Sequence, residues 1–220
     1  MTAVAAARMK PEYGPSLARL LAGPWRAAPL LVRAAVLAAA LALVLALLAL
    51  GLTLENASYT HGGSVAFSFE YRDLYRVAPD AGGYVKVQSR YADGALKYSY
   101  AADPLLLPRY AGAVQGELPL YANGLIATLA RRYPRFALRG EGKAKVNNTL
   151  IGYEVAFTAQ VEGREMYGRD LMFMAPGEHP RAGVLVAMLS APNASSAVLS
   201  PLEVGESGVL LRPLKTFTFG

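Results

Sequence analysis

The residue types that carry most enzyme chemistry are scarce in this chain of 220 residues. It contains no cysteine and two histidines, His61 and His179. The absence of cysteine excludes disulfides, thiolate metal sites, a cysteine nucleophile and a lipid-modified cysteine anchor. Neither histidine has a second histidine at metal-ligand spacing, and no G-x-S-x-G motif accompanies His179. Both histidines are therefore predicted to be exposed loop residues, and no metal or cofactor is predicted.

Carboxylates are the remaining candidates for catalysis. Glu154, Glu162, Glu165 and Asp170 fall on or beside one predicted hairpin. Because paired carboxylates hydrolyse glycosides, a hydrolase that uses Glu165 and Asp170 is one hypothesis. The alternative is structural: carboxylates on strands are usually solvated or ion-paired, and Asp170 alternates with Arg169 as an inward polar residue with a partner. We favour the structural interpretation, which predicts a protein that is not an enzyme.

Tyrosine is the one enriched side chain that suits recognition, with 13 copies in the chain. Its apolar ring and polar hydroxyl are favourable at interfaces. Tyr84, Tyr98, Tyr100 and Tyr110 are therefore candidates for a partner-binding face. The alternative is that they fill half-buried strand positions, which tyrosine also favours.

Residues 65–220 carry the elements that would position these side chains. Alternating apolar and polar residues predict two hairpins, one turning at Asp93-Gly94 and a longer one at Glu162-Gly163. Residues 102–117, rich in proline and glycine, are predicted to be a long loop. Residues 118–133 switch to a three-to-four-residue period, which predicts one main amphipathic helix with Pro119 in its first turn. Residues 183–191 are continuously apolar, as expected of a central strand. The pattern indicates an α+β domain with a mostly antiparallel sheet of six to seven strands.

Residues 34–54 are predicted to form a transmembrane helix. This stretch of 21 residues has no charge and one polar residue, Thr53. A helix of that length rises about 30 Å, the thickness of the hydrocarbon core. A cleaved signal peptide is the rival interpretation. It is disfavoured because the apolar run is long, and because Glu55 spoils the small-x-small site that follows.

The charges around this helix predict its orientation. Residues 1–33 hold five basic side chains and one acidic one, and they include Arg19, Arg26 and Arg33, with Trp25 as an interfacial aromatic. The positive-inside rule then places residues 1–33 in the cytoplasm as a basic tail, and residues 55–220 outside it. Residues 55–64 are predicted to be a linker. Residues 55–220 hold 17 basic and 15 acidic side chains, so the net charge of +6 comes mostly from the tail. No cluster of cations indicates nucleic-acid binding.

The order of elements over residues 64–220 resembles the PsbP-like superfamily, and in particular envelope proteins of the LpqN type. The resemblance rests on the helix at residues 118–134, on residues 146–157 (VNNTLIGYEVAF) and on the closing residues 213–219 (PLKTFTF). It implies a function that is mostly non-enzymatic, as an extrinsic subunit or envelope lipoprotein. This chain departs from the lipoproteins because it has no cysteine to accept a lipid.

The sequence therefore predicts a non-catalytic, single-pass protein of the cell membrane, with a binding or assembly role in the cell envelope. Its partners would be the membrane and either a protein or a small ligand, and not nucleic acid. Two alternatives stay open: a carboxylate-dependent extracytoplasmic hydrolase, and a membrane sensor or regulatory protein whose basic tail is the cytoplasmic contact.

Overall fold

The computed structural model describes residues 29–53, 56–109, 112–147, 150–177, 181–195 and 197–220, without the side chains of residues 47–53 and Gln115. The chain divides into two compact units, Met1–Leu54 and Glu55–Gly220, and each is considered by itself. Three residues predicted to set the membrane orientation, Arg19, Trp25 and Arg26, lie outside the described residues.

The first unit contains the described helix α2 (Leu30–Thr53), which includes most of the segment predicted to span the membrane. Alanine and leucine dominate it, and both have high helix propensity. The side chains of residues 30–46 are exposed except that of Arg33, which is half-buried. No helix among the described residues is long and apolar enough to cross a membrane, and the side chains of residues 47–53 are not described. The membrane anchor therefore stays a prediction.

A seven-stranded sheet forms the centre of the second unit, and all its neighbouring strands are antiparallel. Its strand order is β3-β4-β5-β9-β8-β7-β6. The strands are β3 (Tyr75–Val77), β4 (Val85–Arg90), β5 (Leu96–Leu106), β6 (Ala137–Val146), β7 (Leu150–Val161), β8 (Arg164–Met174) and β9 (Ala182–Ser190). The predicted α+β class with a mostly antiparallel sheet is confirmed.

Both predicted hairpins are present. β4 and β5 are joined through Asp93-Gly94, where Gly94 has a φ of 85° that favours glycine. β7 and β8 are joined at Glu162-Gly163, whose φ values of 51° and 80° are those of a type I′ turn. The strand predicted to be central, β9, lies at the middle of the sheet.

A second sheet of three strands, for which the sequence pattern gives no separate signal, has the order β1-β2-β10. Its strands are β1 (Ala57–His61), β2 (Phe67–Tyr71) and β10 (Thr218–Phe219). The prediction of a linker over residues 55–64 is wrong, because all of β1 pairs with β2 and the ring of Tyr59 packs 5.6 Å from that of Phe69. The predicted sheet of six to seven strands matches the seven-stranded sheet, whereas the three strands of the second sheet are additional to that prediction.

The main helix, α3 (Val114–Arg132), is present but begins a turn before the predicted position. Pro119 consequently lies inside the helix and not in its first turn. The loop predicted for residues 102–117 is wrong at both ends, because β5 continues to Leu106. Pro104 is tolerated in that strand because the pairing with β4 has ended at Ala102, which leaves one edge of β5 unpaired.

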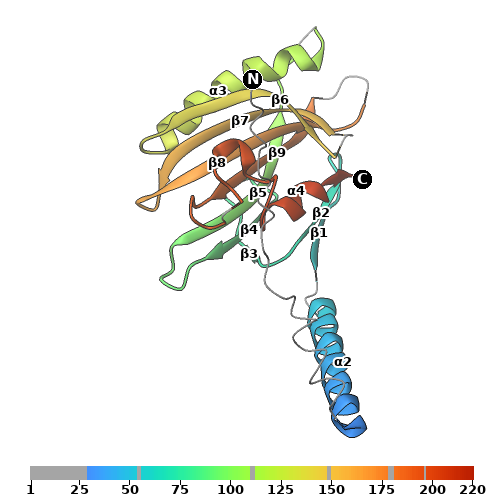
Figure 1. Cartoon of the computed structure of the whole chain (residues 1–220). Helices are drawn as coiled ribbons and strands as arrows, with labels where there is room; N and C mark the ends of the chain where they lie inside the picture. The colour runs from blue at the N-terminus through green and yellow to red at the C-terminus, as the bar shows by residue number, and fades with distance from the viewer. Residues whose placement is uncertain (1–28, 54–55, 110–111, 148–149, 178–180, 196) are drawn as a thin grey trace, which may run out of the picture. The chain divides into compact units, whose positions relative to one another are not determined.

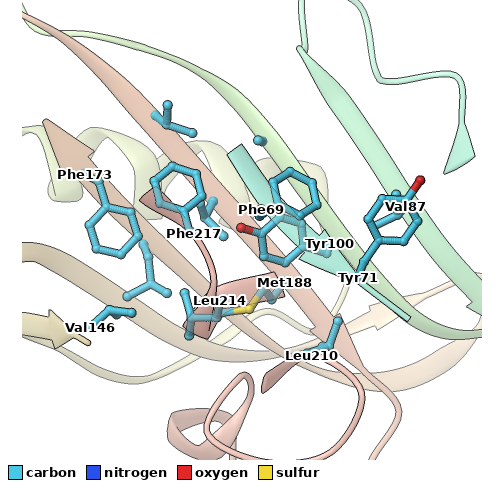
Figure 2. Packing of buried hydrophobic residues seen from close by; sticks show 14 of the residues in the cluster. Phe69, Tyr71, Val87, Tyr100, Val146, Phe173, Met188, Leu210, Leu214 and Phe217 are labelled. Atoms are coloured by element: carbon cyan, nitrogen blue, oxygen red, sulfur yellow. The ribbon is translucent and has the colours of Figure 1, made fainter. Parts of the chain in front are cut away.

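The large sheet separates two apolar layers. On one face α3 packs over a cluster that includes Leu118, Leu129 and Phe157. On the other face the small sheet, the 3-10 turn η1 (Pro201–Glu203) and helix α4 (Leu211–Lys215) enclose a larger cluster. Figure 2 shows Phe69 beside Tyr100, and Phe173 beside Phe217, in that larger cluster. Each fully buried large side chain contributes about 1.5–3 kcal/mol to stability.

Candidate functional site

Helix α3 covers only part of the face of the large sheet on which it lies. It packs on β7 and β6 at one side of the sheet, as Figure 1 shows. Beyond it, the residues of β9 that face the helix side are only half-buried: Leu185, Ala187 and Leu189. The alternate residues of the same strand, on the opposite face, have no exposed surface: Val184, Val186 and Met188.

The less covered part of this face is made by β5 and β9, with Leu185 and Leu189 packed at the margin of the α3 cluster, and we call it the open floor. It consists of the half-buried residues Ala101, Asp103, Leu185, Ala187 and Leu189. Strand register places Ala101 opposite Ala187 and Asp103 opposite Leu185, so these side chains stand on one face. The two alanines rise little above the backbone, which leaves the middle of the floor low.

Asp170 stands at the edge of the open floor. It lies on β8 opposite Ala187, so its side chain points to the same face as the floor. Only 3% of Asp170 is exposed. No described residue donates a hydrogen bond to its carboxylate or forms an ion pair with it. A buried carboxylate without a partner is costly, so this position is unusual for a purely structural residue.

The electrostatics of Asp170 follow from this burial. Burial and, less strongly, the nearby Asp103 carboxylate raise the pKa of its carboxyl to about 7, against the opposing effect of Arg132. The side chain is therefore balanced between its neutral and charged forms near neutral pH. A group in that condition changes its charge readily when a ligand approaches.

Asp103 is the second carboxylate on the floor without an ion pair among the described residues. Burial and the charge of Asp80 raise the pKa of Asp103, while Arg132 and Lys86 oppose that rise. Gly83 makes room for it, because a Cβ atom at that position would lie 2.4 Å from Oδ1 of Asp103.

The two neighbouring cations are already engaged by Asp80. Arg132 donates a hydrogen bond of 2.6 Å to Oδ2 of Asp80, and Lys86 donates one of 3.1 Å to Oδ1. These bonds lower the pKa of Asp80. The Arg132 guanidinium also lies 5.3 Å from the ring centre of Tyr133, the residue that ends α3. Asp103 and Asp170 thus form no ion pair of their own with a described residue, although the charge of Arg132 acts on both.

The predicted tyrosine face is not an exposed face. Tyr98 and Tyr100 are buried in the larger core, where the Tyr98 hydroxyl donates a hydrogen bond of 2.7 Å to the carbonyl oxygen of Ala194. Tyr84 is half-buried and packs against the same core. Tyr110 lies outside the described residues. The prediction is wrong for Tyr98 and Tyr100, because the small sheet covers the face of the large sheet on which they lie, and it stays a prediction for Tyr84.

The carboxylate pair of the hydrolase hypothesis is not assembled. Glu165 is exposed and Asp170 buried, and they lie five residues apart on β8. Side chains at that spacing point to opposite faces and are about 16 Å apart along the strand, too far for the paired carboxylates of a glycosidase. Asp170 is inward and alternates with Arg169 as predicted, but the partner predicted for it is not found among the described residues.

The other predicted candidates are structural or lie outside the described residues. Glu162 is held by Arg90 through two hydrogen bonds of 2.9 Å. His61 is not in a loop: it is half-buried in β1, with its ring 4.1 Å from that of Tyr84. His179 is not among the described residues. Within the described part of the chain, no group of three or more His, Asp or Glu side chains is placed to hold a metal ion.

A separate hollow of about 280 Å³ lies near the end of α3. Its lining includes Arg135, Arg139, Gln160 and Glu165. These four side chains are not buried, and Arg139 already donates a hydrogen bond of 3.2 Å to Thr158. The open floor is the stronger candidate, because it holds two carboxyl groups that burial makes costly and that form no ion pair with a described residue.

Sequence comparison identifies no relative: no family model and no curated protein matches this chain. Comparison with solved structures identifies proteins of similar fold. The chain is similar to LpqN of Mycobacterium tuberculosis, which is described as involved in cell envelope biogenesis, with a TM-score of 0.50 and 8% identity over 75% of this chain and 91% of LpqN. The predicted resemblance to LpqN-type proteins is thus confirmed as a partial likeness of fold. A protein of unknown function from Pseudomonas aeruginosa, PA94, has a TM-score of 0.31 at 15% identity over 64% of this chain and 85% of PA94, too low to support an argument.

Proposed function

We propose that this chain is a non-catalytic protein of the cell envelope that binds a ligand on the open floor of its second unit. The observation that carries the proposal is the half-buried face of β5 and β9, on which Asp170 and Asp103 form no ion pair with a described residue. The fold likeness to LpqN supports placing that role in the envelope. A binding role also agrees with the separation of Glu165 from Asp170, which removes the carboxylate pair on which the hydrolase hypothesis rested.

A membrane anchor completes the proposal. Its support is the uncharged run at residues 34–54 and the excess of basic side chains in residues 1–33. In this proposal the tail faces the cytoplasm and residues 55–220 face outward. The anchor would hold the open floor close to the outer surface of the membrane, where an envelope ligand is concentrated.

Membrane fractionation tests the anchor. The full-length protein should stay in the membrane pellet after alkaline carbonate extraction, while a variant without residues 34–54 should be released. Protease added to spheroplasts should digest the second unit and spare the tail. Replacing Arg19, Arg26 and Arg33 with Glu should reverse that protection pattern. Release of the full-length protein by carbonate would refute the anchor.

A further inference from the structure

We propose that the hollow of about 280 Å³ near the end of α3 binds the carboxylate group of a small organic acid, through Arg135, Arg139 and Thr158. The hollow lies where β6 and the hairpin of β7 and β8 meet the turn that follows α3. It is a second site, independent of the proposed ligand on the open floor, because no residue of that floor lines it.

The backbone at Arg135 is unusual in a way that serves the hollow. Its φ of 52° lies in the left-handed region, which an arginine seldom adopts. The backbone N–H of Gln160 donates a hydrogen bond of 2.8 Å to the carbonyl oxygen of Pro134, which fixes this turn on β7. Such conformations cost free energy and cluster where a group must be positioned for function. The Arg135 side chain lines the hollow and forms no hydrogen bond or ion pair with another described residue.

Arg139 reaches the same hollow from a second backbone irregularity. The pairing of β6 with β7 shifts register between Leu138 and Gly140, so Arg139 has no residue opposite it. A bulge of this kind re-aims the side chain that it carries, and bulges are frequent beside active sites. Nε of Arg139 donates a hydrogen bond of 3.2 Å to Oγ1 of Thr158, while its two terminal nitrogens bond to no described residue.

Thr158 adds a buried hydroxyl to the two guanidinium groups. It lines the hollow and is only 7% exposed. Its oxygen accepts the hydrogen bond from Arg139, but its own hydrogen has no acceptor among the described residues. A buried donor without an acceptor is costly, so an oxygen atom that entered the hollow would be stabilised there. Three side chains thus offer donors to one space in which no described group accepts them.

The donors and the remaining charge decide the class of ligand. A guanidinium presents a planar fork of N–H groups that matches a carboxylate or a phosphate. Glu165 lines the same hollow without an ion pair to a described residue, so its charge disfavours a ligand with two negative charges. A carboxylate with one charge is therefore favoured over a phosphate.

The size and walls of the hollow favour a short ligand. Its volume of about 280 Å³ is at the lower limit of the pockets that hold drug-sized molecules. Ala137, Ala159 and Gly163 contribute little side-chain volume to the lining. A hydrocarbon chain of a few carbon atoms could contact the two alanines while its carboxylate is held by the arginines.

The test is calorimetric titration of the full-length protein in a non-ionic detergent at pH 7.5 and constant ionic strength. Sodium butyrate is the probe, butyramide its neutral match and inorganic phosphate the more highly charged anion. Butyramide should bind at least about 10-fold more weakly than butyrate, because hydrogen bonds to a charged acceptor are stronger. Phosphate should also bind more weakly than butyrate.

Single substitutions assign the binding to the hollow. Arg135→Gln and Arg139→Gln should each weaken butyrate binding by about 5-fold or more, since each removes one charged donor. Glu165→Gln should tighten it by about 2-fold or more, because a neighbouring negative charge is removed. Arg109→Gln is the matched control and should bind as the wild type does, because Arg109 is exposed and follows β5 at the end of the sheet opposite to the β7–β8 turn.

Several results would overturn the site: equal binding of butyrate and butyramide, tighter binding of phosphate, unchanged binding in either lining arginine variant, or an equal loss in Arg109→Gln. Weaker binding by Glu165→Gln would also contradict it. A thermal melt of each variant separates lost binding from lost folding. Glu165→Gln decides the matter even if an arginine variant unfolds, because tighter binding cannot result from a loss of folded protein.

Discussion

At the scale of single residues, Arg169 and Asp170 are neighbours on β8 and both are buried, but only Arg169 is paired. Arg169 is 6% exposed, and its guanidinium is fully engaged. It donates to Glu154 at 2.6 and 2.8 Å, to Glu206 at 2.7 Å and to the carbonyl oxygen of Val204 at 3.0 Å. Asp170 points to the other face and has no such partner. The first arrangement stabilises the fold, while the second leaves a buried carboxyl without an ion-pair partner among the described residues.

Burial of the Asp170 carboxyl should make the free energy of unfolding depend on pH. Its carboxyl has a pKa of about 7 in the folded state, against 3.8 in a solvated chain. The folded state therefore holds the proton more tightly, and stability is lost as pH rises from about 4 to about 7, by on the order of 4 kcal/mol. Asp170→Asn removes this loss, so the free energy of unfolding of the variant should gain on that of the wild type over the same range.

Urea denaturation of the wild type and of Asp170→Asn at pH 4 and pH 8 measures the effect. The cost of burying an asparagine amide does not depend on pH, so it cancels when the two differences are compared. A difference between variant and wild type that stays constant from pH 4 to pH 8 would contradict the burial described for Asp170.

Replacing Arg169 with methionine should destabilise the second unit by about 3–5 kcal/mol, because Glu154 is left buried without its partner. The side chain of Glu154 is 16% exposed, whereas that of Glu206 is 56% exposed. Glu206→Gln is therefore the matched control, and it should cost less than about 1 kcal/mol. Urea midpoints compare the two variants. Similar losses of stability in both would show that the Arg169–Glu154 pair contributes no more than the Arg169–Glu206 pair.

At the scale of elements, the ring of Phe157 on β7 packs directly over Gly168 on β8. A Cβ atom there would lie 2.2 Å from the ring of Phe157, which is 1% exposed. Gly168→Ala should therefore displace that ring and cost about 1–3 kcal/mol through strain in a packed core. Gly142→Ala on β6 is the matched control, since its Cβ would meet nothing within 4 Å. Thermal melts of the two variants should differ by several degrees, and equal melting temperatures would refute the close contact.

Short-range sequence patterns were enough to predict the turns, the central strand and the main helix. The Asp93-Gly94 and Glu162-Gly163 turns, the central strand and the main helix all follow from short-range patterns. The end of β5 could not be predicted, because Pro104 indicates a loop unless it is known that the pairing of β5 with β4 stops at Ala102. Likewise the burial of Tyr98 and Tyr100 depends on the small sheet, whose strands β2 and β10 lie some 150 residues apart in the chain.

The candidate site was accessible to sequence reasoning only in part. The alternation of residues on the strand predicts Asp170 to be an inward carboxylate with a partner, but it does not identify that partner. Its lack of a partner follows from register, which places Arg169 opposite Ala156 and Asp170 opposite Ala187. Asp103 lies in the segment predicted to be a loop, so no sequence signal associated the two carboxylates.

At the scale of the whole molecule, the second unit contains every described strand and all of its apolar clusters. Residues 55–220 should therefore fold without the first unit. Expressed alone, they should give a single cooperative thermal transition within a few degrees of that of the full-length protein in detergent. Loss of near-ultraviolet circular dichroism in the shortened protein would show that its core depends on residues 1–54.

The pairing of β10 with β2 has a consequence for biosynthesis. Phe217, 2% exposed, contacts Phe67 and Phe173 in the larger core, and the backbone N–H of Gly220 bonds to the carbonyl oxygen of Ala66. A ribosome makes β2 some 150 residues before these closing residues. The nascent chain cannot complete its core until translation has passed Phe217. If the second unit crosses a membrane during synthesis, it therefore does so before it can fold, in the extended form that a narrow translocation channel requires.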